Sequence, residues 1–138
     1  MIIHVSEQER VVDNPEHGYR VLSGYFATLD RVDRDKEHFF VLHLDVRNKI
    51  KAFELVSVGT LNTSLVHPRE VFTRAIGLRS AQLIIAHNHP SGVTRPSEED
   101  LELTKRLVKA GDILGIPIVD HIIFTRDSFT SFQEQRLI

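Results

Sequence analysis

Two histidines and a downstream aspartate have the residue types and the spacing of a metal site. His87 and His89 stand two residues apart at the end of the apolar run 81–86, so an extended backbone would point both imidazoles to one side. Asp100 follows a loop with two prolines and a glycine, in the first turn of an expected helix, where its carboxylate can face the same space. Two neutral imidazoles and one carboxylate leave a tetrahedral zinc ion with one open position, which is typical of a catalytic site.

The same residues also allow a purely structural interpretation. The two histidines can be ordinary polar residues at a strand end. Asp100 can simply complete a capping box with Ser97 at the start of the helix. An H-x-H pattern alone would favour this interpretation. The chain has no cysteine, which excludes thiolate zinc sites, iron–sulfur clusters, disulfides and a cysteine nucleophile, and its eight histidines leave imidazole and carboxylate as metal ligands.

The elements that must position these residues follow one another in the order αββαβαβ. Apolar periodicity, turn residues and caps predict a helix over 15–30, strands over 38–45 and 50–58, a helix from residue 68, a strand over 81–86, a helix over 97–115 and a strand over 117–125. The connections are a charged segment over 30–36 and loops over 59–67 and 88–96, and the tail 128–138 has no decisive pattern. This order predicts a mixed α/β or α+β sandwich with the apolar 81–86 strand near its centre.

Length and composition predict one folded domain. The 138 residues are 41% hydrophobic and 26% charged, as in ordinary globular domains. No apolar stretch approaches the roughly 20 residues that cross a bilayer, and the start has no signal-peptide pattern, so we expect a soluble cytoplasmic protein without membrane contact. The net charge of −2 gives little electrostatic attraction to nucleic acid. Nothing in the pattern indicates an oligomeric state.

The candidate ligands and their neighbours resemble a known family. The pattern H-x-H, seven residues, S-x-x-D is the JAMM (JAB/MPN+) metalloprotease motif, which this chain matches without a gap at His87, His89, Ser97 and Asp100. Three stretches are similar to the RadC branch: GTLNTSLVHPREVF (59–72), AHNHPSG (86–92) and LGIPIVDHIIF (114–124). The resemblance covers residues 37–132 and implies a JAB/MPN-like mixed sheet flanked by helices, a cytidine-deaminase-like sandwich.

This resemblance implies a zinc-dependent hydrolase that cleaves a peptide or isopeptide bond by attack of a zinc-bound water. It implies one zinc ion per chain, held by His87, His89 and Asp100. Ser97 matches the family serine that hydrogen-bonds the tetrahedral oxyanion, a role that helix capping by the same side chain does not exclude. The substrate is then a peptide or protein of unknown identity.

The resemblance also implies a glutamate on an early strand that acts as general base. The candidates before the histidines are Glu37, Glu54 and Glu70. In JAMM enzymes this glutamate opens the first strand of a hairpin, and a helix and a strand then lead into H-x-H. Glu37 directly precedes the strand of 38–45 and matches this order, so we assign it as the general base.

Asp120 and His121 form a polar pair inside the apolar run 118–124. Buried polar groups need partners, so the pair can contact the metal ligands from behind. A hydrogen-bonded histidine in the core is an equally good interpretation, and neither residue is included among the predicted ligands.

Two other functions compete with hydrolysis. The resemblance to RadC suggests a DNA-repair-associated nucleic-acid-binding protein. A non-catalytic scaffold is the other alternative, because some MPN domains have this role. RadC proteins commonly carry a helix-hairpin-helix segment upstream, whereas the 36 residues before Glu37 have room for one helix. We therefore expect a single RadC-like JAB/MPN domain over 1–138, with an N-terminal helical segment (1–36), a JAMM core (37–132) and no helix-hairpin-helix domain. We expect DNA binding to be weak, and the complete ligand set argues against a scaffold.

Overall fold

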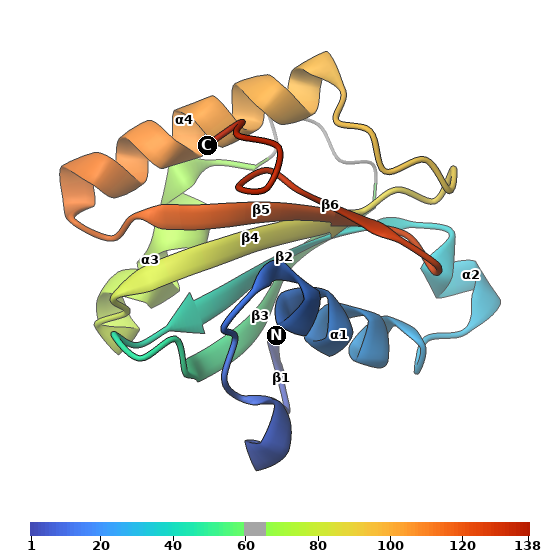
Figure 1. The fold of residues 1–138 in the computed structure, drawn as a ribbon, viewed down its shortest axis with the longest axis horizontal. Helices are drawn as coiled ribbons and strands as arrows, with labels where there is room; N and C mark the ends of the chain where they lie inside the picture. Colours follow the sequence, from blue (N-terminus) through green and yellow to red (C-terminus); the bar gives the residue numbers. More distant parts are fainter. Residues whose placement is uncertain (60–65) are drawn as a thin grey trace.

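A mixed sheet forms the centre of the molecule (Figure 1). A computed structural model describes residues 1–59 and 66–138, and within them six strands lie in the order β1-β3-β2-β4-β5-β6. Their bounds are β1 Ile2–Ile3, β2 Glu37–Leu44, β3 Ile50–Gly59, β4 Gln82–Asn88, β5 Ile118–Phe124 and β6 Phe129–Ser131. Strand β4 runs antiparallel to β2 and parallel to β5, so the apolar run 81–86 lies inside the sheet, as predicted.

Helices cover both faces of this sheet. Their bounds are η1 Glu7–Glu9 (a 3-10 turn), α1 Pro15–Phe26, α2 Arg31–Arg34, α3 Pro68–Leu78 and α4 Glu98–Leu114. Helix α1 lies on one face, and α3 and α4 lie on the other (Figure 1). Alternate side chains of β2 divide between these layers, since Phe40 and Leu42 pack with α1 whereas Phe39 and Val41 pack with α3 and α4. The domain is a mixed α/β sandwich, which confirms the predicted fold class.

The structure adds short elements that the sequence pattern did not predict. Strands β1 and β6 have only two and three residues, too few for a period-2 pattern to be detected. The first helix ends at Phe26 instead of near residue 30, and the charged segment after it contains α2. The Asp30 carboxylate caps α2 by accepting from the Asp33 amide at 2.8 Å. Most of the predicted loop over 59–67 falls on residues 60–65, which lie outside the described residues.

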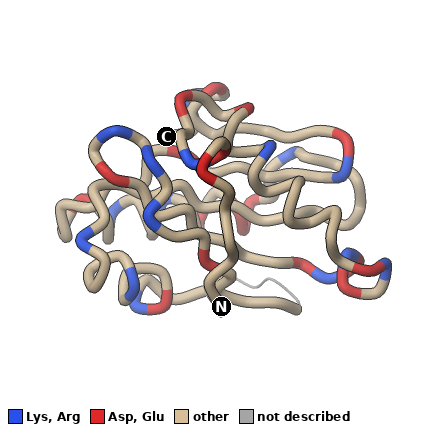
Figure 2. The backbone as a smooth tube through the Cα atoms, turned by 90° about the horizontal axis from the view of Figure 1, so that it is seen from below, with Lys and Arg blue, Asp and Glu red and all other residues tan. Residues whose placement is uncertain are grey.

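Charged residues are interspersed over the described part of the chain. In Figure 2 basic positions have acidic ones beside them in most of the loops and helices in view. Within residues 1–59 and 66–138, none of the helices is both long and apolar enough to cross a membrane.

Candidate metal centre

His87, His89 and Asp100 converge at the carboxyl end of β4. His87 lies in β4, His89 directly follows it, and Asp100 lies in the first turn of α4. The two oxygens of Asp100 lie 3.1 Å from His87 Nε2 and 3.1 Å from His89 Nε2, and the two Nε2 atoms are 3.0 Å apart. The three possible ligand atoms all lie within 4.8 Å of one another, so this group can hold a metal ion.

The start of α4 fixes the carboxylate of Asp100. Ser97 is the N-cap residue, and its hydroxyl accepts from the Asp100 amide at 3.0 Å. In return, the Ser97 amide donates to Asp100 Oδ2 at 2.9 Å, which completes a capping box. The structural interpretation and the metal-site interpretation are therefore not alternatives, because one carboxylate closes the cap and also faces both histidines.

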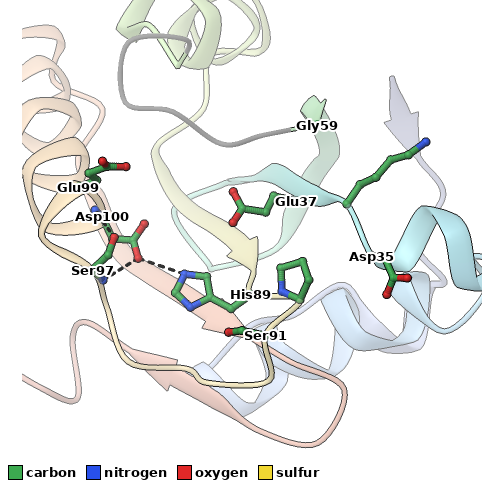
Figure 3. A pocket seen from close by; sticks show the side chains of 10 residues that line it. Asp35, Glu37, Gly59, His89, Ser91, Ser97, Glu99 and Asp100 are labelled. Carbon is green, nitrogen blue, oxygen red and sulfur yellow. Dashed lines mark hydrogen bonds and ion pairs between the residues drawn. The ribbon is translucent and has the colours of Figure 1, made fainter.

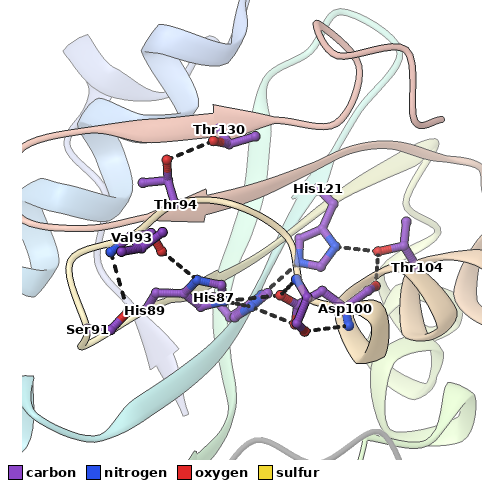
Figure 4. A network of polar contacts seen from close by, with 10 residues as sticks. His87, His89, Ser91, Val93, Thr94, Asp100, Thr104, His121 and Thr130 are labelled. Carbon is purple, nitrogen blue, oxygen red and sulfur yellow. Dashed lines mark hydrogen bonds and ion pairs between the residues drawn. The ribbon is translucent and has the colours of Figure 1, made fainter.

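Hydrogen bonding fixes which nitrogen of His89 faces the candidate ligands. His89 Nδ1 lies 2.8 Å from the carbonyl oxygen of Val93 in the loop after β4 (Figure 4). A carbonyl oxygen only accepts, so Nδ1 carries the proton in this contact. The Nε2 atom of neutral His89 is then left with its lone pair toward Asp100, as metal ligation requires.

The charges of these residues are coupled. Burial raises the pKa of Asp100, but the hydrogen bonds from His87 and His89 outweigh burial and hold this pKa far below its ordinary range. The hydrogen bond to Asp100 raises the pKa of His89, and burial opposes that change. Asp100 is therefore an anion at physiological pH. A metal ion must displace any proton from the imidazole nitrogens in order to bind, so acid is expected to weaken metal binding.

The candidate metal centre opens into a cleft of about 640 Å³. The predicted general base, Glu37, lines this cleft together with His89, Ser97 and Asp100 (Figure 3). Glu37 is the first residue of β2, and its carboxylate points into the cleft. The hydrogen bond to Asp100 is the main cause of the raised pKa of His89, and the negative charge of Glu37 adds a smaller contribution.

The side chain of Asn88 connects the start of β2 to the end of β4. Asn88 is the last residue of β4, where the sequence predicted the start of a loop. Its amide oxygen accepts from the His38 backbone N–H at 2.7 Å, and its amide nitrogen donates to the Lys36 carbonyl at 3.0 Å. These two backbone groups flank Glu37, so the residue between the two histidines also fixes the backbone of the predicted base.

The other two glutamates considered for the base lie elsewhere. Glu54 is buried in β3 and bonds His43 Nε2 at 2.9 Å and Arg74 Nε at 3.2 Å. Glu70 is exposed on α3 and lines a different cleft, which Glu54 also lines.

The structure separates the roles of Asp120 and His121. His121 Nε2 lies 2.8 Å from His87 Nδ1, so it contacts a candidate ligand from behind. Burial lowers the pKa of His121 well below its ordinary value, with the nearby His87 adding to this effect. Asp120 accepts instead from the Ser131 hydroxyl at 2.7 Å and from the Gln133 amide at 2.9 Å, and thus fixes the end of β6 and the segment after it. Burial raises the pKa of Asp120, and these hydrogen bonds oppose that rise.

The sequence pattern did not indicate a role at the site for Thr104, whose hydroxyl lies 2.6 Å from His121 Nδ1. Its position held a usable signal: Thr104 follows Asp100 by four residues on a predicted helix, so both residues lie on one face.

The mixed sheet between helices, with the His–His–Asp group at the end of its central strand, defines a JAB-type domain. The chain belongs to the family described as RadC-like JAB domain, whose model matches residues 12–137.

Curated relatives share about half of their residues with this chain over the matched region. A UPF0758 protein of Desulforamulus reducens is 51% identical over 109 residues, which are 79% of this chain and 48% of that protein. A UPF0758 protein of Picosynechococcus is 46% identical over 125 residues, which are 91% of this chain and 49% of that protein. The chain thus spans about half the length of the curated relatives that it matches.

Proposed function

We propose that this domain is a zinc-dependent hydrolase that cleaves a peptide or isopeptide bond. The observation that carries the proposal is the convergence of His87, His89 and Asp100 at a cleft that Glu37 also lines. Two imidazoles and a carboxylate form a donor set that suits zinc and leaves a fourth position for a water or a substrate. The donor set therefore fits one zinc ion, with these three residues as its protein ligands.

The chemistry divides between the metal and three groups of the protein. Bound zinc would supply Lewis-acid chemistry, which polarises a carbonyl and lowers the pKa of a coordinated water. The Glu37 carboxylate would accept the proton of the attacking water and deliver it to the leaving nitrogen. The Ser97 hydroxyl uses a lone pair for the helix cap, so its proton is left to be donated to the developing oxyanion.

We propose a peptide or protein, and not a nucleic acid, as the partner of the cleft. Interspersed acidic and basic residues (Figure 2) and a net charge of −2 give few clustered cations, so few counterions are released on binding DNA. A salt titration with duplex and single-stranded DNA tests this: we expect weak, sequence-independent binding, and tight binding at physiological salt would contradict the proposal.

The direct test is a peptide-library cleavage screen with a chelator control. We expect elemental analysis to find one zinc per chain in protein purified without a chelator or metal-affinity tag. We expect cleavage that the chelator abolishes and added zinc restores. Cleavage that survives the chelator would contradict zinc-dependent hydrolysis. Stoichiometric zinc without cleavage of any library member would favour a non-catalytic scaffold.

A further inference from the structure

Behind His87, buried side chains form a continuous polar network that ends on α4. His87 Nδ1 lies 2.8 Å from His121 Nε2, and His121 Nδ1 lies 2.6 Å from Thr104 Oγ1 (Figure 4). The Thr104 hydroxyl also lies 2.8 Å from the carbonyl oxygen of Asp100. His87 and His121 are fully buried and Thr104 is 2% exposed, so solvent cannot substitute for these partners. We call His87, His121 and Thr104 the α4 network.

Aromatic packing fixes the ring planes within the α4 network. The His121 ring stacks on Phe132 with centroids 4.5 Å apart. The His87 ring lies nearly parallel to Phe39, with centroids 6.4 Å apart. Because the rings are confined between packed neighbours, the remaining freedom of the network is the placement of its protons.

One proton arrangement satisfies every hydrogen bond of the α4 network and also leaves His87 able to bind a metal. A carbonyl oxygen only accepts, so the Thr104 hydroxyl donates to Asp100 and accepts from His121 Nδ1–H. His121 Nε2 then holds a lone pair that accepts from His87 Nδ1–H. The lone pair of His87 Nε2 is left facing His89 and Asp100.

The reverse arrangement has two disadvantages. If the Thr104 hydroxyl donates to His121 Nδ1, its bond to the Asp100 carbonyl is lost. His121 Nε2–H would then donate to His87 Nδ1, which places the proton of neutral His87 on Nε2, the atom that must coordinate the metal.

We infer that Thr104 and His121 are positioning residues that select the tautomer of His87 for metal binding. The inference rests on the proposed zinc site and extends it to residues that do not touch the metal. It gives Asp100 two functions at once, since its carboxylate is a ligand and its carbonyl sets the direction of the α4 network. The first turn of α4 thereby controls two of the three protein ligands.

Paired substitutions at Thr104 test this inference through zinc affinity. Thr104→Val keeps the shape of the side chain and removes the hydroxyl, so His121 Nδ1–H loses its buried acceptor in the metal-binding arrangement. We expect Zn²⁺ affinity, measured by competition with a chromogenic chelator, to fall about 10- to 100-fold, as for other groups that orient metal ligands. Thr104→Ser restores the hydroxyl, and we expect it to restore the affinity.

Ser80→Ala is the matched control. It removes a hydroxyl from another buried histidine, His43, whose Nδ1 atom lies 3.3 Å from Ser80 Oγ. The hydrogen bonds of Ser80 and His43 do not involve His87, His89 or Asp100, so we expect Ser80→Ala to keep wild-type zinc affinity. A loss in Ser80→Ala equal to that in Thr104→Val would mean that general destabilisation, and not the α4 network, lowers the affinity.

Nitrogen-15 NMR of the zinc-loaded wild-type protein tests the tautomer directly and needs no variant. We expect His121 to carry its proton on Nδ1, and a proton on Nε2 would overturn the inference. If the wild type binds zinc and folded Thr104→Val binds it equally well, the positioning role alone fails. If the wild type binds no zinc, the proposed function fails first and the positioning role falls with it.

Discussion

Two clusters of histidine and carboxylate lie beside different parts of β2, and they differ in the groups that pair with the carboxylate. The candidate metal centre (His87, His89 and Asp100) lies beside Phe39, which pairs with His87. The second group, which we call the His43 cluster, consists of His43, Glu54, Arg74 and Ser80. Its Glu54 carboxylate has an arginine partner, whereas the recorded ion pairs of Asp100 among the described residues are with histidines alone. A carboxylate without a fixed cation is available to a metal ion.

Access to solvent is the second difference. The His43 cluster contains the residue types of a hydrolytic triad, namely Ser80, His43 and Glu54. Ser80 Oγ lies 3.3 Å from His43 Nδ1, and His43 Nε2 lies 2.9 Å from Glu54 Oε1. However, His43 is fully buried and Ser80 is 6% exposed, so a substrate carbonyl cannot reach the hydroxyl. His89 and Ser97 instead line an open cleft. Hydrogen-bonded histidine and carboxylate thus support structure in the His43 cluster, whereas the proposed chemistry lies at the candidate metal centre, and exposure to solvent distinguishes the two.

The largest expected effect is the loss of zinc from His89→Ala. We expect elemental analysis to give no zinc where the wild type holds one per chain, because two remaining ligands do not form a zinc site. The free energy of unfolding of the metal-free protein should change little, since His89 is only partly buried. Stoichiometric zinc in His89→Ala would contradict the assigned ligand set.

The matching change in the His43 cluster is His43→Ala, and its effect should be the opposite. We expect stoichiometric zinc but a lower free energy of unfolding, by about 1–3 kcal/mol, because Glu54 loses a buried hydrogen-bond partner. Loss of zinc from this variant with its fold intact would break the proposed division between the two clusters.

The next effect concerns the two glutamates. Glu37→Gln should keep zinc and stability and slow hydrolysis by about 10²- to 10⁴-fold, because an amide cannot accept the proton of the attacking water. Glu54→Gln should leave hydrolysis nearly unchanged and destabilise the fold, because it removes the charge that faces Arg74. Cleavage of a substrate found in the library screen and urea unfolding measure the two effects. Equal losses of activity in Glu37→Gln and Glu54→Gln would contradict the assignment of Glu37 as the general base.

The sequence predicted most of the fold because the long elements carry clear patterns. The continuous apolar run of β4 and the N-cap of α4 were sufficient to position the H-x-H and S-x-x-D motifs on neighbouring elements. The two-residue strand β1 and the edge strand β6 carry no comparable pattern.

The sequence could not predict which side chains from distant parts of the chain contact each other. Nothing local distinguishes His121, which reaches the candidate metal centre, from Asp120, which bonds the end of β6 and the segment after it. Successive strand residues point to opposite faces, so the two roles separate once the sheet is placed. The partnership of His43 with Glu54 likewise depends on the register between β2 and β3.

A smaller effect is expected at Asn88, which touches no candidate ligand atom but fixes the backbone around Glu37. Asn88→Ala leaves the His38 amide and the Lys36 carbonyl without this partner, so we expect the start of β2 to shift. Hydrolysis should fall about 10-fold while zinc stays bound, because a small displacement of a catalytic group is costly. Ser80→Ala in the His43 cluster is the comparison, with stability lowered by roughly 1 kcal/mol and hydrolysis unchanged. Unchanged hydrolysis in Asn88→Ala would show that Glu37 needs no such support.

The smallest effect is the pH dependence of stability that the His43 cluster contributes. Burial lowers the pKa of His43, and the hydrogen bond to Glu54 only partly opposes this. In the unfolded chain His43 titrates near its ordinary value of about 6.5, so below that pH the unfolded state binds more protons than the folded state. The stability that neutral His43 contributes is therefore complete above about pH 6.5 and declines as the pH falls toward the folded-state pKa.

The difference between wild type and His43→Gln isolates this contribution. His121 has a lowered pKa and His89 a raised one, and both are present in either protein, so their effects cancel in the difference. Urea unfolding in a chelator, at about pH 7.5 and about pH 5.5, should show that acid destabilises the wild type more than the variant. An equal acid response would mean that folding leaves the pKa of His43 unchanged. A weaker acid response in the wild type than in the variant would mean that the buried His43 is already protonated in the folded state. Its ion pair with Glu54 would then be a permanent part of the core.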